Sequence, residues 1–253
     1  MLFRRPPFFP FVIPVVIFNA LVSMIISLPL FREAVHESTP AMIAFQLVVF
    51  VAHYFMLNLA LGLLIALLST VLSRRPLAFV SGFLFLFLQM LLIIDTRIYT
   101  IFHYHINALV WNMLTTEGVT DSVMLGKNTV LTFSVFLVII FAAETFVLIR
   151  IGRLSPEKER VLARVSKILF FICLAGIAID KSSYAYANLV NNTKVTQNSK
   201  LYLLYQPLTI NRFAHKVLHI NVNREKELKV NNGYRDINYP KEHLRFDPKR
   251  NRK

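Results

Sequence analysis

Five long apolar runs constrain the fold of this chain more than any other feature. The runs cover residues 8–31, 41–72, 77–94, 129–149 and 168–179. A helix needs roughly 20 consecutive apolar residues to cross the hydrocarbon core of a bilayer, and the first four runs reach or approach that length. The fifth run is short, so a helix there must continue through residues 184–187 to complete a crossing. The pattern predicts an all-α membrane protein with five transmembrane helices.

The composition agrees with a membrane class and excludes several kinds of site. Of the 253 residues, 55% are hydrophobic and 22 are Phe. The single cysteine, Cys173, rules out a disulfide within one chain and a cysteine-based metal site, and we expect it to be a packing residue. With only 7 glycines, a glycine-rich phosphate loop is not expected. We predict no cofactor.

The net charge of +14 raises the question of nucleic acid, but the positions of the basic residues favour a membrane explanation. The loops on the N-terminal side carry Arg4, Arg5, Arg74, Arg75 and six more Lys or Arg residues in the connector 150–167. The loops on the other side carry only Arg32, Arg97 and Lys127. Loops rich in Lys and Arg stay in the cytoplasm. We therefore expect a cytoplasmic N-terminus, a periplasmic basic tail and no nucleic-acid partner.

The end of the third apolar run carries an unusual set of polar and aromatic residues. They are Asp95, Arg97, His103, His105, Asn107 and Trp111, the only tryptophan of the chain. Charges followed by Tyr, His and Trp are typical of a helix that leaves the bilayer at headgroup depth. We interpret this stretch as a membrane-interface motif, in which Asp95 and Arg97 form a structural pair or cap the following loop.

Two catalytic or transport hypotheses remain beside this interpretation. The H-x-H motif at 103–105 could bind Zn or Fe together with Asp95 and either His53 or His36. The spacing is common and no third ligand is fixed, so interfacial histidines are the preferred interpretation and we predict no metal. Glu144, the one acid of the fourth span, could belong to a proton path, but such residues more often reach the membrane edge or bond a neighbouring helix.

The stretch 201–220 predicts an aromatic loop followed by a basic amphipathic helix. Thr209 is a suitable N-cap. Apolar residues can share one face of that helix, and basic residues lie nearer the other: Leu208, Phe213, Val217 and Ile220 against Arg212, Lys216 and His219. Such a helix can lie in the interface and contact anionic lipid. The alternative is a solvated helix packed on a further domain.

The run IDTRIYTIFHYHINALVW at 94–111 resembles the corresponding loop of the YejM (PbgA) family of inner-membrane sulfatase-like proteins. The matching residues are Asp95, Thr96, Phe102, His103, His105, Asn107 and Trp111. Two further blocks are similar to that family, within 184–213 and 238–246. The resemblance therefore covers nearly the whole chain and is most specific at 94–111.

The resemblance implies a five-helix anchor of the Gram-negative inner membrane. In that family an external hydrolase-like domain of the alkaline phosphatase superfamily follows the linker, and it should begin just past residue 253. We therefore expect a transmembrane domain at 1–190 and an interfacial helix with a linker at 191–253. On this expectation the chain is not an enzyme, because the superfamily's nucleophile and metal ligands are absent from it.

The resemblance also suggests a ligand. Some members sense lipopolysaccharide, and the lipid A headgroup is held near the match to TINRF at 209–213. Arg212 carries over, whereas Asn211 stands where a second arginine is common. We expect Thr209, Arg212, Phe213 and Lys216 to bind lipopolysaccharide or another anionic lipid.

Two functions follow from this resemblance. The first is a non-catalytic anchor and regulatory module in envelope homeostasis, with membrane lipids and another inner-membrane protein as partners. The alternative is the membrane anchor of an active phospho- or sulfoester hydrolase, or a headgroup transferase, encoded separately.

Overall fold

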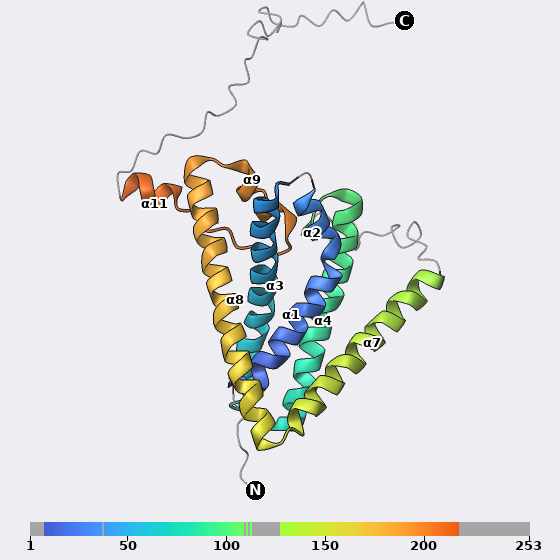
Figure 1. Cartoon of the computed structure of the whole chain (residues 1–253). Helices are drawn as coiled ribbons and strands as arrows, with labels where there is room; N and C mark the ends of the chain where they lie inside the picture. Colours follow the sequence, from blue (N-terminus) through green and yellow to red (C-terminus); the bar gives the residue numbers. More distant parts are fainter. Residues whose placement is uncertain (1–7, 37, 109, 111, 113–126, 218–253) are drawn as a thin grey trace, which may run out of the picture.

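The computed structural model describes residues 8–36, 38–108, 110, 112 and 127–217. Every regular element in these residues is helical (Figure 1). Five helical segments are long and apolar enough to cross a membrane: Phe9–Ile26, Pro40–Leu68, Pro76–Phe102, Leu131–Ile151 and Pro156–Val190. For the described residues, the predicted all-α fold with five helices long and apolar enough to span a membrane is therefore confirmed. The short fifth run reaches this length because its helix begins in the polar connector and continues through residues 184–187.

The first apolar run forms three helical pieces instead of one. They are the π-helical turn η1 (Phe8–Val12), α1 (Ile13–Ile26) and α2 (Leu28–Val35). Ser27 separates α1 from α2, and a proline occupies the first turn of α2. Proline has no N–H to continue the hydrogen-bond ladder of the preceding helix, so it suits the start of a new one.

The other long helices are α3 (Pro40–Leu68), α4 (Arg74–Phe102), α7 (Lys127–Gly152) and α8 (Pro156–Val190). The sequence prediction ended the third span at residue 94, which is too early. Helix α4 runs on through Asp95 and Arg97 and stops where His103 takes a left-handed conformation, with φ 56°. The polar residues were taken as a helix exit, but they lie within the last turns of the helix.

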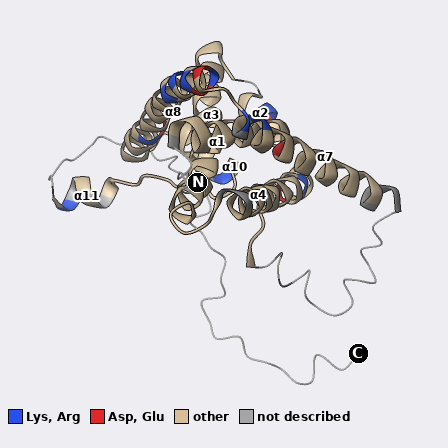
Figure 2. Ribbon diagram, turned by 90° about the horizontal axis from the view of Figure 1, so that it is seen from below, with Lys and Arg blue, Asp and Glu red and all other residues tan. Residues whose placement is uncertain are grey.

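The two ends of the bundle differ in what they carry. The first described residues lie at one end, and α2 lies at the other with three short helices: α9 (Thr193–Thr196), α10 (Asn198–Leu201) and α11 (Asn211–Lys216) (Figure 1). We refer to these as the N-terminal end and the α11 end. Viewed from the N-terminal end, Lys and Arg gather along the start of α8 (Figure 2). Five crossings place residue 8 and α11 at opposite ends.

A network of buried polar side chains joins α1, α3 and α4 inside the bundle. Asn58 Nδ2 donates to Ser23 Oγ at 2.9 Å and to the carbonyl of Tyr54 at 2.8 Å. Ser23 Oγ donates to Gln89 Oε1 at 3.2 Å, and Gln89 Nε2 donates to the carbonyl of Asn19 at 3.1 Å. The hydrocarbon of a bilayer offers these groups no hydrogen-bond partner. Their hydrogen bonds to one another therefore hold α1, α3 and α4 in register.

Gly62 of α3 allows the close approach of α1. A Cβ atom at this position would overlap the side chain of Val16. We expect Gly62→Ala to lower the stability of the bundle by about 1–3 kcal/mol, the usual cost of overpacking. The matched control is Gly176→Ala in α8, where the added Cβ would lie 3.6 Å from Ala52, an ordinary contact. Thermal unfolding in detergent tests this, and equal midpoints for the two variants would contradict it.

Candidate functional site

After α8 the chain turns back into the bundle, and we name residues 193–205 the fold-back segment. The turn begins at Asn191, which is left-handed with φ 62°. Gln46 Nε2 of α3 donates to Asn198 Oδ1 at 2.9 Å, and both residues are fully buried. Tyr202 is 1% exposed, and its ring stacks on His53 with centroids 5.3 Å apart. Buried Asn198, Leu201, Tyr202 and Tyr205 thus attach an otherwise partly exposed segment to the bundle.

Asp180 of α8 fixes the end of the fold-back segment. Its carboxylate accepts a hydrogen bond of 2.7 Å from the Tyr205 hydroxyl and forms an ion pair of 3.0 Å with Lys181. The Lys181 amine also lies 3.9 Å from the centroid of the Tyr205 ring. Burial and the hydrogen bond to Asp180 raise the pKa of Tyr205 above its usual value, so the hydroxyl remains a donor at neutral pH. Two interactions of Tyr205, with Asp180 and with Lys181, thus join the end of the segment to α8.

The membrane-interface motif forms a cap on α4. Asp95 is 1% exposed and accepts two hydrogen bonds, from His105 Nδ1–H at 2.8 Å and from the backbone N–H of Ile106 at 2.9 Å. The ring of Tyr99 packs on His105, with centroids 4.7 Å apart. Of the two roles expected for Asp95, capping the following loop is the one observed. Its side-chain partner is His105, and the predicted pair with Arg97 does not form.

The other motif residues lie around this cap without entering it. His103 is exposed, and its Nδ1 lies 3.6 Å from Glu33 of α2. Asn107 Oδ1 accepts the backbone N–H of Val110 at 3.0 Å. Trp111 lies outside the described residues.

The metal hypothesis finds no support in the described part of the chain. His103 and His105 face different acids, Glu33 and Asp95. No group of three His, Cys, Asp or Glu side chains among the described residues could hold a metal ion. His53, one of the two histidines considered beside His36 as a further ligand, stacks on Tyr202.

Glu144 lies in the contact between α4 and α7. It is 2% exposed, and its carboxylate and the ring of Phe141 face Gly82 of α4. Among the described residues neither carboxylate oxygen has a hydrogen-bond partner. Of the two preferred expectations for Glu144, a hydrogen bond to a neighbouring helix is not formed among the described residues, and burial against α4 does not fit a side chain that extends away from the bundle.

Helix α11 carries the residues predicted to bind lipid. It begins after Ile210, and no side chain caps it, so the prediction of Thr209 as N-cap is wrong. Thr209 and Lys216 are exposed, and the backbone of Arg212 belongs to the helix. Three apolar side chains are also largely exposed here: Leu208, Phe213 and Val217. Ile220 and His219 lie outside the described residues.

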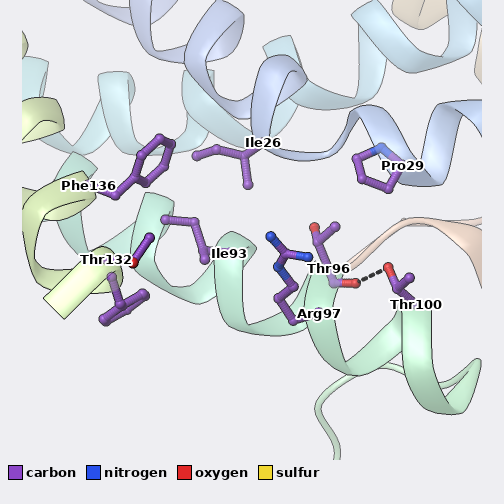
Figure 3. A pocket seen from close by; sticks show the side chains of 9 residues that line it. Ile26, Pro29, Ile93, Thr96, Arg97, Thr100, Thr132 and Phe136 are labelled. Carbon is purple, nitrogen blue, oxygen red and sulfur yellow. Dashed lines mark hydrogen bonds between the residues drawn. The ribbon is translucent and has the colours of Figure 1, made fainter. Parts of the chain in front are cut away.

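A groove of about 730 Å³ opens near the α11 end, between α4 and α7. The residues that line it are Ile26, Pro29, Ile93, Thr96, Arg97, Thr100, Thr132, Phe133 and Phe136 (Figure 3). Arg97 is the one charged residue of this lining.

A family model of a domain of unknown function, DUF3413, matches residues 11–246. The chain belongs to the DUF3413 family. The matched range includes the five spans, the fold-back segment and α11, so these form parts of one DUF3413 domain. No curated protein matches the chain.

Two features of this DUF3413 domain were not predicted from the sequence. The first is the burial of Tyr202 and Tyr205, which were interpreted as part of an aromatic loop. The second is the groove, which depends on how α7 is inclined to α4 (Figure 1). One sequence signal pointed to the buried tyrosines, the Asp180–Lys181 pair, which was expected to lie close to the bilayer. No sequence signal indicated the groove.

Proposed function

We propose that this DUF3413 protein is a non-catalytic membrane module that binds anionic lipid at its α11 end and couples that contact to the helix bundle. In its finer form, the proposal assigns the chain to a relative of the YejM (PbgA) family in the Gram-negative inner membrane. Its N-terminus would then be cytoplasmic, and α11 would lie at the periplasmic surface. The ligand would be lipopolysaccharide or another anionic lipid, in a role in envelope homeostasis.

One observation carries the proposal: the fold-back segment is fixed inside the bundle by buried polar contacts. Gln46 of α3 holds its middle through Asn198, and Asp180 of α8 holds its end through Tyr205. Helix α11 begins at Asn211, six residues after Tyr205. Lipid binding that orders α11 therefore acts on a segment that is hydrogen-bonded to α3 and to α8.

The chemistry of α11 suits the surface of an anionic membrane. Exposed Phe213 and Val217 supply apolar area, and exposed Lys216 supplies charge. Apolar insertion and attraction to anionic headgroups together hold interfacial helices on membranes. Arg212 and Lys216 are four positions apart in α11, the spacing at which two residues of a helix are neighbours on its surface.

The test is lipid binding by the purified full chain, followed by native mass spectrometry in detergent with lipopolysaccharide or phosphatidylglycerol added. We expect Arg212→Ala and Lys216→Ala each to weaken binding roughly fivefold, since a basic residue near an anionic surface contributes about 1 kcal/mol. The double variant should approach the product of the two effects.

The control is the pair Arg153→Ala and Lys158→Ala, which removes the same charge from exposed positions at the N-terminal end. Equal binding by the Arg212→Ala, Lys216→Ala double variant and this control would contradict the proposal. A preference for lipopolysaccharide over phosphatidylglycerol in the wild type would support the finer form.

A further inference from the structure

The groove between α4 and α7 is a feature that lipid binding at α11 does not use. We infer that it is a separate site for an anionic phospholipid, with the phosphate at Arg97 and one acyl chain between the two helices. Helix α11 and helix α7 lie on opposite flanks of the bundle in both views (Figures 1 and 2). The two sites are therefore distinct.

The groove exists because α7 contacts α4 over only part of its length. The close contact is at Gly82, which faces Glu144 and Phe141 of α7. Toward the α11 end α7 inclines away from the bundle (Figure 1). The first turns of α7 after Lys127 contribute Thr132, Phe133 and Phe136 to the groove wall. A volume of about 730 Å³ falls within the range of roughly 300–1,000 Å³ that small-molecule sites occupy.

Arg97 is available to a ligand. Its nearest acid in sequence, Asp95, is bonded to His105 and Ile106. The ion pairs among the described residues do not include Arg97, whose side chain is exposed. Its guanidinium lies among apolar side chains at the groove (Figure 3). An arginine in such surroundings favours a planar anion such as phosphate or carboxylate, which it can bind with two hydrogen bonds.

A second polar group lies next to Arg97. The Thr96 hydroxyl is buried, and it has no hydrogen-bond partner among the described residues. Thr100 does not satisfy it, because the Thr100 hydroxyl donates to the backbone carbonyl of Thr96 at 2.6 Å (Figure 3). A buried hydroxyl without a partner is costly, and a ligand oxygen at this place would satisfy it.

The depth of Arg97 fits a lipid headgroup. It lies five residues before Phe102, the last residue of α4, which is about 8 Å along the helix axis. The apolar residues Ile93 and Phe136 lie further from that end, on the path of an acyl chain. Basic pockets between spanning helices are known to hold anionic lipid headgroups.

The lining favours a lipid over a helix of another protein. Helices that pack in membranes present small residues at the contact, as Gly82 does against α7. The groove instead presents Ile26, Ile93, Phe133 and Phe136, which are bulky. A flexible acyl chain can follow such a surface, whereas a helix backbone cannot approach it closely.

The experiment uses the full chain in nanodiscs that contain phosphatidylglycerol with a photoreactive group midway along one acyl chain. After illumination, peptide mass spectrometry locates the labelled residues. We expect labels on α4 and α7 near the groove, competed by unlabelled phosphatidylglycerol and not by phosphatidylcholine. Arg97→Gln should lower this labelling about tenfold, the effect of losing a charge-assisted contact. Arg97→Lys, which keeps the charge, should retain most of it.

Two controls separate this site from the one at α11. Lys200→Gln removes an exposed charge at the same end of the bundle and should leave the labelling of α4 and α7 unchanged. Arg212→Ala should also leave it unchanged, even where binding at α11 is lost. Equal labelling of the groove in Arg97→Gln and Lys200→Gln, or labels spread evenly over all spans, would overturn the inference.

Discussion

Replacing Asp95 with alanine is expected to lower the thermal unfolding midpoint more than any other single change in the interface motif. The carboxylate is buried and accepts from His105 Nδ1–H and from the backbone N–H of Ile106. Alanine would leave both donors without an acceptor, and each orphaned buried donor costs about 1–3 kcal/mol. We therefore expect a total loss of about 2–6 kcal/mol, together with release of the chain that follows Phe102.

The measurement is thermal unfolding of the purified protein in detergent. Asp95→Asn keeps one carbonyl oxygen as an acceptor, so its midpoint should lie between those of the wild type and Asp95→Ala. The control is Arg97→Ala, two positions along the same helix. Because Arg97 is exposed and is not part of the cap, its removal should leave the midpoint nearly unchanged. Similar midpoints for Asp95→Ala and Arg97→Ala would show that the cap contributes little.

The difference between Asp95 and Arg97 also shows what the sequence could not predict. Both residues were interpreted as marking the end of the third span, since charges usually leave the hydrocarbon. In the structure one is buried in a cap and the other lines a groove. Asp95 is buried because its hydrogen-bond partners, His105 and Ile106, come from the chain that follows α4. The hydropathy of the sequence does not predict such partners.

The spans themselves were predictable because crossing length and hydropathy are local properties. The fifth span was predicted to continue through residues 184–187, and α8 does so. The break at Ser27 was missed, although Pro29 two residues later offered a signal.

The fold-back segment was not predictable by the same means. Its fixing contacts join residues far apart in the chain, such as Gln46 with Asn198, and a single pair leaves no periodic pattern. The segment is short, with two helices of four residues each, and its tyrosines are equally common at membrane interfaces. Only the pairing with Asp180 distinguishes Tyr205 as a buried residue.

Asp180→Ala is expected to release the fold-back segment from the bundle. The substitution removes the acceptor of the Tyr205 hydroxyl and leaves the largely buried Lys181 amine without its counter-ion. Breaking a buried pair by removing one partner costs about 3–5 kcal/mol. Limited trypsin digestion in detergent reports the release, since Lys194 and Lys200 lie within the segment. Cleavage after these residues should become faster in Asp180→Ala than in the wild type.

Tyr205→Phe provides the graded control, because it removes the hydrogen bond and keeps both the ion pair and the ring over Lys181. Its effect should be smaller, about 1.5–3 kcal/mol for one hydrogen bond to a charged group. If trypsin cleaves Asp180→Ala and the wild type at the same rate, Asp180 does not hold the segment in place.

The same variant decides whether the fold-back segment couples α11 to the bundle. A ligand that binds only the folded protein raises its unfolding midpoint. If α11 acts through the segment, lipopolysaccharide or phosphatidylglycerol should raise the midpoint of Arg97→Gln, which lacks the groove site, and leave that of the Arg97→Gln, Asp180→Ala double variant nearly unchanged, although the α11 residues remain. An equal rise in both proteins would mean that lipid bound at α11 stabilises the bundle without the Asp180–Tyr205 contact. Coupling would then have to run through the Gln46–Asn198 hydrogen bond in the middle of the segment, which Gln46→Leu would test.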